Sequence, residues 1–72
     1  MAEKRKTQII PKAPVARILM NAGAKRVSAE AVEEFADIIQ DIALGVGEKA
    51  IRIAKHSGRK TVHGEDIKIA SR

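Results

Sequence analysis

The sequence predicts an all-α chain: a short helix, a loop, a long central helix, a second loop and a final short helix. The central helix is predicted from the stretch Ser28–Gly58, which contains no proline and repeats apolar residues three and four positions apart. Ser28 can cap the first turn of this helix, and Gly58 supplies a left-handed stop. Two shorter apolar segments, both bounded by helix-breaking residues, lie on either side of it.

The central helix is too long to be covered by the rest of this chain. It would extend roughly 43 Å, whereas a compact domain of this length has a diameter of less than about 30 Å. Its apolar stripe therefore requires a second chain, and we expect a dimer. The residues expected in the dimer core share that stripe: Val32, Phe35, Ile39, Ile42 and Val46.

The opposite face of the central helix changes sign along its length. Carboxylates project within roughly a 100° arc of its earlier part: Glu30, Glu33, Glu34, Asp37, Asp41 and Glu48. Basic residues follow, beginning at Lys49 and continuing through Arg52 and Lys55 into the next loop. We interpret the acidic face as solvated, and the basic end as a candidate binding surface.

The first short helix is predicted from Pro14 to Ala22. Proline suits the first position of a helix because its missing N–H has no partner there. Gly23 ends this helix, and the following loop carries Lys25 and Arg26.

The last short helix is predicted to follow a second basic loop, Gly58–Val62. Either Thr61 or His63 can cap it, and Glu65 and Asp66 in its first turn suit the helix dipole.

Composition indicates a protein that binds a polyanion. The 72 residues include 14 basic and 9 acidic side chains, which give a net charge of +5. A membrane surface is disfavoured as the polyanion because Trp and Tyr are absent and Phe35 lies on the core stripe. The lack of cysteine excludes disulfides and fits a reducing intracellular setting. We expect no membrane-spanning segment or signal peptide, because the chain has no long apolar run.

Two regions are expected along the chain. Residues Met1–Gln8 are polar and basic, and we predict a disordered tail that either adds phosphate contacts or serves as a passive leader. Residues 9–72 form the folded domain.

Enzymatic and metal chemistry are not expected. His56 and His63 are the two histidines, and no third ligand lies at a zinc-like spacing from them. There is no cysteine nucleophile, and Gly45 and Gly47 lie inside a predicted helix, not in a phosphate-binding loop after a strand. We therefore predict no catalytic residue, no metal and no cofactor.

Three motifs resemble those of archaeal histones. They are Ala13-Pro14-Val15 followed by Arg17, the run from Ala22 to Ser28, and the run from Ala54 to Val62 with Glu65-Asp66-Ile67 beyond it. The resemblance covers Ile9 to Ala70. It implies a histone fold in a handshake dimer, in which two central helices cross and the first loop of each chain lies beside the partner's second loop.

The resemblance also implies a function and a set of site residues. The function is sequence-tolerant binding, wrapping and compaction of double-stranded DNA by a cytoplasmic, chromosome-associated protein. The residues implied for DNA binding are Arg17 and Arg26 at the minor groove, Lys60 and Thr61 at phosphates, and Lys25 and Pro14 nearby. Arg59 and Asp66 would form a structural salt bridge. Contacts between dimers would use Ile53, His56, Asp66 and Ile69.

Three questions stay open at this stage. The chain can pair with itself or with a paralogue, and higher oligomers can form on DNA. A histone-fold heterodimerisation module of a transcription complex is the alternative function. The sequence offers no account of His63 and Gly64, and Gly45 and Gly47 either allow a close helix crossing or are tolerated weak points.

Overall fold

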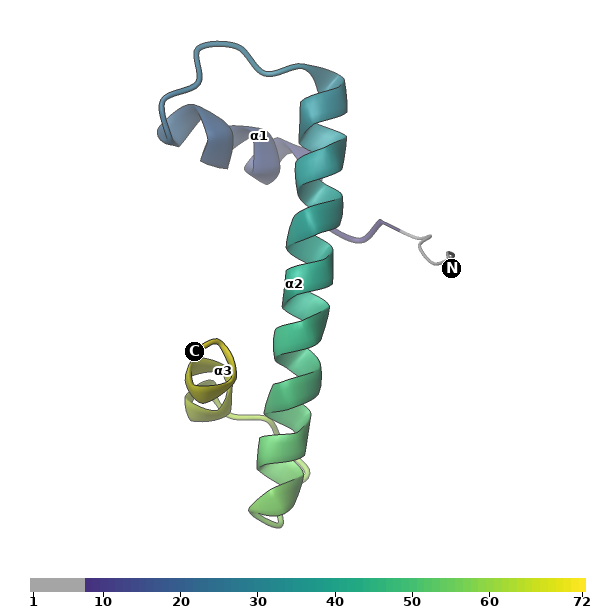
Figure 1. Cartoon of the computed structure of the whole chain (residues 1–72), viewed down its shortest axis with the longest axis vertical. Coiled ribbons are helices and arrows are strands. Elements are labelled where there is room, and N and C mark those ends of the chain that lie inside the picture. The colour runs from purple at the N-terminus through teal and green to yellow at the C-terminus, as the bar shows by residue number, and fades with distance from the viewer. Residues whose placement is uncertain (1–7) are drawn as a thin grey trace. The chain divides into compact units, whose positions relative to one another are not determined.

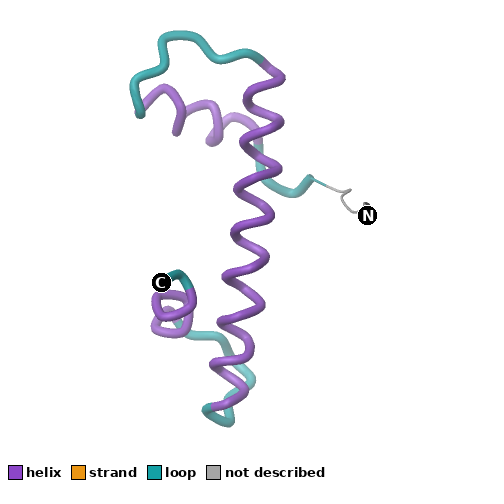
Figure 2. Tube along the Cα trace, viewed as in Figure 1, coloured by secondary structure: helices purple, strands orange, loops and turns teal. Residues whose placement is uncertain are grey.

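The computed structural model describes residues 8–72, and within them it contains three helices and no strand (Figures 1 and 2). The helices are α1 (Lys12–Asn21), α2 (Ala29–His56) and α3 (Gly64–Ala70). This order of short, long and short helices confirms the predicted all-α fold class. Within the described residues, none of these helices combines the length and apolar character needed to cross a membrane.

Helix α1 begins two residues before the predicted start. Pro11 is its N-cap in extended conformation, so that Pro14 lies in the third helical position instead of the first. The missing N–H of Pro14 still costs no hydrogen bond, because the N–H groups of a first turn have no helical partner. The helix ends at Asn21, where the amide of Ala22 donates to the carbonyl of Ile18 at 3.0 Å, and Gly23 follows with a φ of 120°.

Both predicted ends of the central helix are confirmed by their cap geometry. At the start of α2, the amide of Ala31 donates to Oγ of Ser28 at 3.0 Å. At its end, Gly58 takes a φ of 75°, and the amide of Arg59 donates back to the carbonyl of Ala54 at 2.9 Å. The left-handed residue thus lets the chain leave the helix while its last carbonyls stay hydrogen-bonded.

The chain forms two compact units, Met1–Gln40 and Asp41–Arg72, and α2 contributes to both. In the first unit, α1 packs on the early part of α2 through a core of Val15, Val32 and Ala36, with Phe35 and Ile39 partly buried against it. Val15 is 1% exposed. Apolar side chains therefore hold the first unit together.

The segment before α1 is also attached to α2, which corrects the predicted boundary of the tail. The amide of Ile9 donates to Oε1 of Gln40 at 2.7 Å. Gln8, which we placed in the disordered tail, donates through its side-chain amide to Asp37 and accepts from the amide of Ile10. The rest of the predicted tail, residues 1–7, lies outside the described residues.

The second unit has a core of small side chains around one charged group. Ala50, Ala54 and Ala70 are buried, together with Asp66. Larger apolar residues of this unit stay exposed in the single chain: Ile42, Leu44, Ile51, Val62, Ile67 and Ile69.

The five residues predicted for the dimer core differ in burial. Val32 is buried within its own unit. Phe35, Ile39 and Val46 are half-buried, and Ile42 is 62% exposed. The latter part of this stripe is therefore the part that the single chain leaves most open to a partner.

Candidate nucleic-acid interface

The loop between α2 and α3 is held by a network centred on Asp66. Arg59 forms a two-pronged contact with this carboxylate: Nη1 donates to Oδ2 at 2.9 Å and Nη2 donates to Oδ1 at 3.0 Å. The backbone amide of His63 also donates to Oδ2, at 2.8 Å. The Arg59–Asp66 ion pair expected from the resemblance is thus present, and it joins the start of the loop to α3.

The network also reaches the loop backbone. Nη1 of Arg59 donates to the carbonyl oxygen of Thr61 at 3.1 Å. One guanidinium therefore holds the loop backbone and a helix side chain together. Lys60 and Thr61, which lie between the two braced ends, are exposed.

The charges of this network stabilise one another. The Arg59 guanidinium, followed by the His63 amide, lowers the pKa of Asp66 from its ordinary value of 3.8 to about 2. The hydrogen bond from Arg59 to Asp66 in turn raises the pKa of Arg59. The Asp66 side chain is 2% exposed and that of Arg59 is 32% exposed, so the carboxylate is enclosed by its partners. Both groups are therefore ionised at neutral pH, and the brace is intact there.

His63 has a structural place that the sequence did not explain. It is the N-cap of α3, in extended conformation with φ −104° and ψ 165°. This conformation directs its backbone amide to the carboxylate of Asp66 three residues later, which is half of a capping box. His63 therefore takes part in the brace through its backbone.

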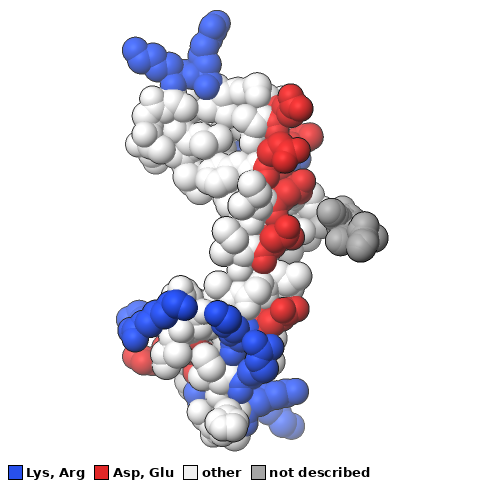
Figure 3. All heavy atoms as spheres, in the orientation of Figure 1, with Lys and Arg blue, Asp and Glu red and all other residues white. Residues whose placement is uncertain are grey.

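The other residues predicted to bind DNA lie in the first unit. Pro14 and Arg17 are on α1, and Lys25 and Arg26 are on the loop between α1 and α2; all four are exposed. In the same unit the carboxylates of α2 gather on one face, drawn red in Figure 3. The predicted DNA-binding residues of one chain thus belong to two separate units, with Lys60 and Thr61 in the second.

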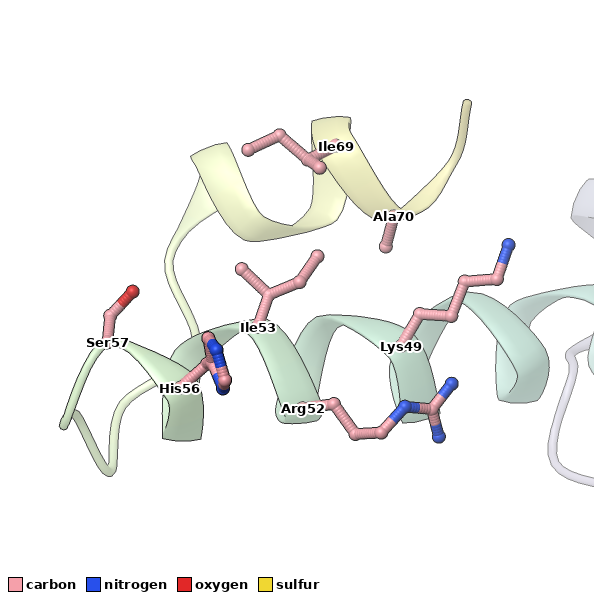
Figure 4. Close-up of a pocket in the computed structure, with 7 residues that line it drawn as sticks. All are labelled: Lys49, Arg52, Ile53, His56, Ser57, Ile69 and Ala70. Atoms are coloured by element: carbon pink, nitrogen blue, oxygen red, sulfur yellow. The ribbon is translucent and has the colours of Figure 1, made fainter.

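A groove lies between the last part of α2 and α3 within the second unit (Figure 4). It has a volume of about 470 Å³ and is lined by Lys49, Arg52, Ile53, His56, Ser57, Ile69 and Ala70. Three of the four residues predicted for contacts between dimers, Ile53, His56 and Ile69, therefore share one groove. The fourth, Asp66, does not line it, because its carboxylate is engaged by Arg59 and His63.

Sequence reasoning did not assign Lys49 and Arg52 to any site. Their signal was their spacing: positions 49, 52, 53 and 56 lie on one face of a helix. Within residues 8–72, no three His, Cys, Asp or Glu side chains are placed to hold a metal ion.

Comparison with known proteins gives consistent relatives. Residues 8–70 match the family described as histone-like transcription factor (CBF/NF-Y) and archaeal histone. The chain is 49% identical over 63 residues to probable archaeal histone 3 of Methanocaldococcus jannaschii, covering 88% of this chain and 94% of that protein. It is 44% identical over 61 residues to the archaeal histone HAN1 of Thermococcus zilligii, covering 85% of this chain and 91% of that protein. Identity to the DNA-binding protein HmvA of M. jannaschii is 38% over 60 residues, which covers 83% of this chain and 62% of that protein.

Proposed function

This chain belongs to the family of archaeal histones and histone-like transcription factors, and on that premise we propose that it binds double-stranded DNA as a dimer and compacts it. It acts as an architectural protein of chromatin and is located at the nucleoid. Its family is one of DNA-packaging proteins and is not known for enzymes. The alternative function, a dimerisation module in a transcription complex, is not favoured, because the curated relatives are named archaeal histones.

The observation that carries this proposal is the braced basic loop. Arg59 and Asp66 hold its two ends, and the exposed Lys60 and Thr61 lie between them. An ammonium and a hydroxyl on a rigid loop are suited to phosphate oxygens, which are the same in every DNA sequence. Binding at this loop therefore depends on the charge and shape of the duplex and not on its bases.

The exposed cations of the first unit extend this interface. Arg17 and Arg26 insert toward the minor groove, and Lys25 and the Pro14 end of α1 lie beside the phosphates. These roles are supported by the exposure of all four residues and by the net charge of +5. In a handshake dimer the first loop of one chain lies next to the partner's second loop, which joins the two sets of residues.

Dimerisation is supported by the apolar surface of the single chain. Ile42 and Leu44 are each 62% exposed and Ile38 is 52% exposed, all on one continuous helix. A second copy that crosses α2 covers the stripe of Phe35, Ile39, Ile42 and Val46. We propose the homodimer as the basic unit, with pairing to a paralogue as its variant.

Higher assembly on DNA uses the groove between α2 and α3. Ile53 and Ile69 supply its apolar part, and His56 lies on its lining. Asp66 supports this contact from behind by holding the position of α3. Dimers joined at this groove can continue along a duplex and wrap it.

The test is the salt dependence of DNA binding by Lys60→Ala. A dimer carries two copies of Lys60, so the slope of log K against log salt concentration should become shallower by about two. Affinity should fall by a similar factor for duplexes of unrelated sequence. Lys55→Ala is the matched control, because it removes the same charge from an exposed position on α2 outside the loop.

Two results would contradict the proposal. One is a duplex that the native protein prefers over all others by orders of magnitude. The other is a Lys60→Ala protein whose affinity and salt slope match those of Lys55→Ala.

A further inference from the structure

We propose that the groove between α2 and α3 takes a protein surface whose apolar side chains are flanked by carboxylates, and that a second copy of the same groove is a poor occupant. This inference rests on the proposed function, because it specifies the partner at the contact between dimers. It predicts that native dimers join most readily to a more acidic histone-fold partner.

The floor of the groove is apolar and incompletely covered. In Figure 4, Ile53 is directed from α2 toward α3, and Ala70 is directed from α3 toward α2. Ile53 is half-buried and Ile69 is 50% exposed. An occupant with apolar side chains would remove this surface from water.

The polar part of the lining is cationic and unpaired. Lys49 and Arg52 are exposed on α2, and neither forms an ion pair with any residue in the range 8–72. His56 and Ser57 complete the polar lining, and none of the seven lining residues carries a carboxylate. The groove therefore has an excess of positive charge that its own side chains do not offset.

The carboxylate expected to meet His56 across the contact has little capacity left. Asp66 is 2% exposed, and both of its oxygens already accept hydrogen bonds from Arg59, with a further one from the His63 amide. It is also absent from the lining of the groove. The internal brace thus uses the negative charge that a self-complementary contact would need.

Symmetry makes this charge a determinant of partner choice. When two identical grooves meet about a two-fold axis, both sides present the same lining. Every charged group of this lining then faces other cations, and like charges across an interface oppose association. A partner with carboxylates opposite Lys49 and Arg52 gains the same apolar contact and two ion pairs in addition.

A charge-reversed copy of the chain serves as the acidic partner in the test. The double variant Lys49→Glu/Arg52→Glu keeps the apolar floor and reverses both cations at exposed positions. Native protein and variant are mixed without DNA, and species larger than a dimer are measured by sedimentation equilibrium. The mixture should form them at a concentration at least tenfold lower than either protein alone, and added salt should remove this difference. Dimers that exchange chains still carry one groove of each kind.

A matched control separates the groove from net charge. Lys55→Glu/Lys68→Glu makes the same charge change at two exposed positions that do not line the groove. A mixture of this variant with native protein should assemble no better than native protein alone. Circular dichroism of each variant checks that its helices are retained.

Several outcomes would overturn the inference. They are native dimers that assemble as readily as the mixture, a mixture that does not assemble, and equal assembly with the control variant. The groove would instead be a DNA contact if the mixture stayed unassembled while Lys49→Glu/Arg52→Glu lost DNA affinity as Lys60→Ala does. DNA binding by the native protein is measured in parallel, and its absence would contradict the proposed function without changing the result on the groove.

Discussion

The two units of this chain hold their short helices by different means. In the first unit, α1 is held by apolar packing of Val15 against Val32 and Ala36. In the second unit, the buried apolar side chains are all alanines, and a charged pair, Asp66 with Arg59, connects α3 to the preceding loop. One short helix therefore depends on hydrophobic burial, and the other depends on ionised partners.

This difference follows from what each unit carries. The loop of the second unit exposes Lys60 and Thr61, and the ion pair holds the backbone on both sides of them. Apolar packing is non-directional, whereas a two-pronged guanidinium–carboxylate contact fixes orientation. The comparison teaches that the unit with the braced phosphate-binding loop exchanges apolar burial for geometry, and that the two units respond to different perturbations.

The largest expected effect is the loss of apolar packing at Phe35. This ring is partly buried against the core of the first unit and lies on the stripe that meets the partner. Phe35→Ala should lower the free energy of unfolding by about 3 kcal/mol. Urea unfolding at two protein concentrations measures it, and the native midpoint should rise with concentration because folding is coupled to dimerisation.

Ile9→Ala is the control for this substitution, because Ile9 belongs to the same unit and is 74% exposed. It should have a much smaller effect. A native midpoint independent of concentration would contradict the dimer, and a Phe35→Ala loss as small as that of Ile9→Ala would contradict the role of the ring.

Acid should weaken the second unit through Asp66. Its pKa in the folded chain is about 2, below the ordinary value of 3.8 that it regains on unfolding. The stabilisation from this shift is therefore present above about pH 4 and is lost as the pH falls toward 2. Urea unfolding between pH 5 and pH 2, roughly the range these two values set, should show this loss in the native protein.

Asp66→Asn isolates the contribution of this carboxylate. The variant should be less stable at neutral pH, and its deficit relative to native protein should shrink as the pH falls. Glu65→Gln is the matched control, since Glu65 is the exposed neighbour in the same turn of α3 and should leave the acid response unchanged. An Asp66→Asn protein with the full native acid response would assign the response to other groups.

The smallest expected effect concerns the glycines of α2, which all fall in the second unit's part of the helix. Gly45 is exposed, and a Cβ there would meet nothing within 4 Å in the single chain. Gly45→Ala should therefore raise the free energy of unfolding by up to about 1 kcal/mol through helix propensity. Gly47 is half-buried and serves as the comparison.

Thermal unfolding of both variants sharpens the picture of the dimer. If the partner helix crosses close to Gly47, Gly47→Ala should destabilise the dimer while Gly45→Ala stabilises it. A loss of stability in Gly45→Ala would place the close approach at Gly45 instead.

The sequence by itself determined the features that depend on neighbouring residues. The Ser28 cap and the left-handed Gly58 set the ends of α2, because caps act within one turn. The apolar stripe, the two basic loops and the histone motifs were equally legible. The start of α1 was misplaced by two residues because Pro11 and Pro14 are both compatible with a helix N-terminus, and the local pattern does not distinguish them.

Only the tertiary structure decided which distant residues meet. Gln8 and Ile9 contact Asp37 and Gln40 across 29 and 31 positions, which no periodicity encodes. The groove exists because α3 folds back on α2, and this places Ile69 and Ala70 beside Lys49 and Arg52. Asp66 could have faced that groove, but its burial against Arg59 removed its charge from the surface. Charge on a sequence is only a count, and the fold decides which charges are paired and which are left for a partner.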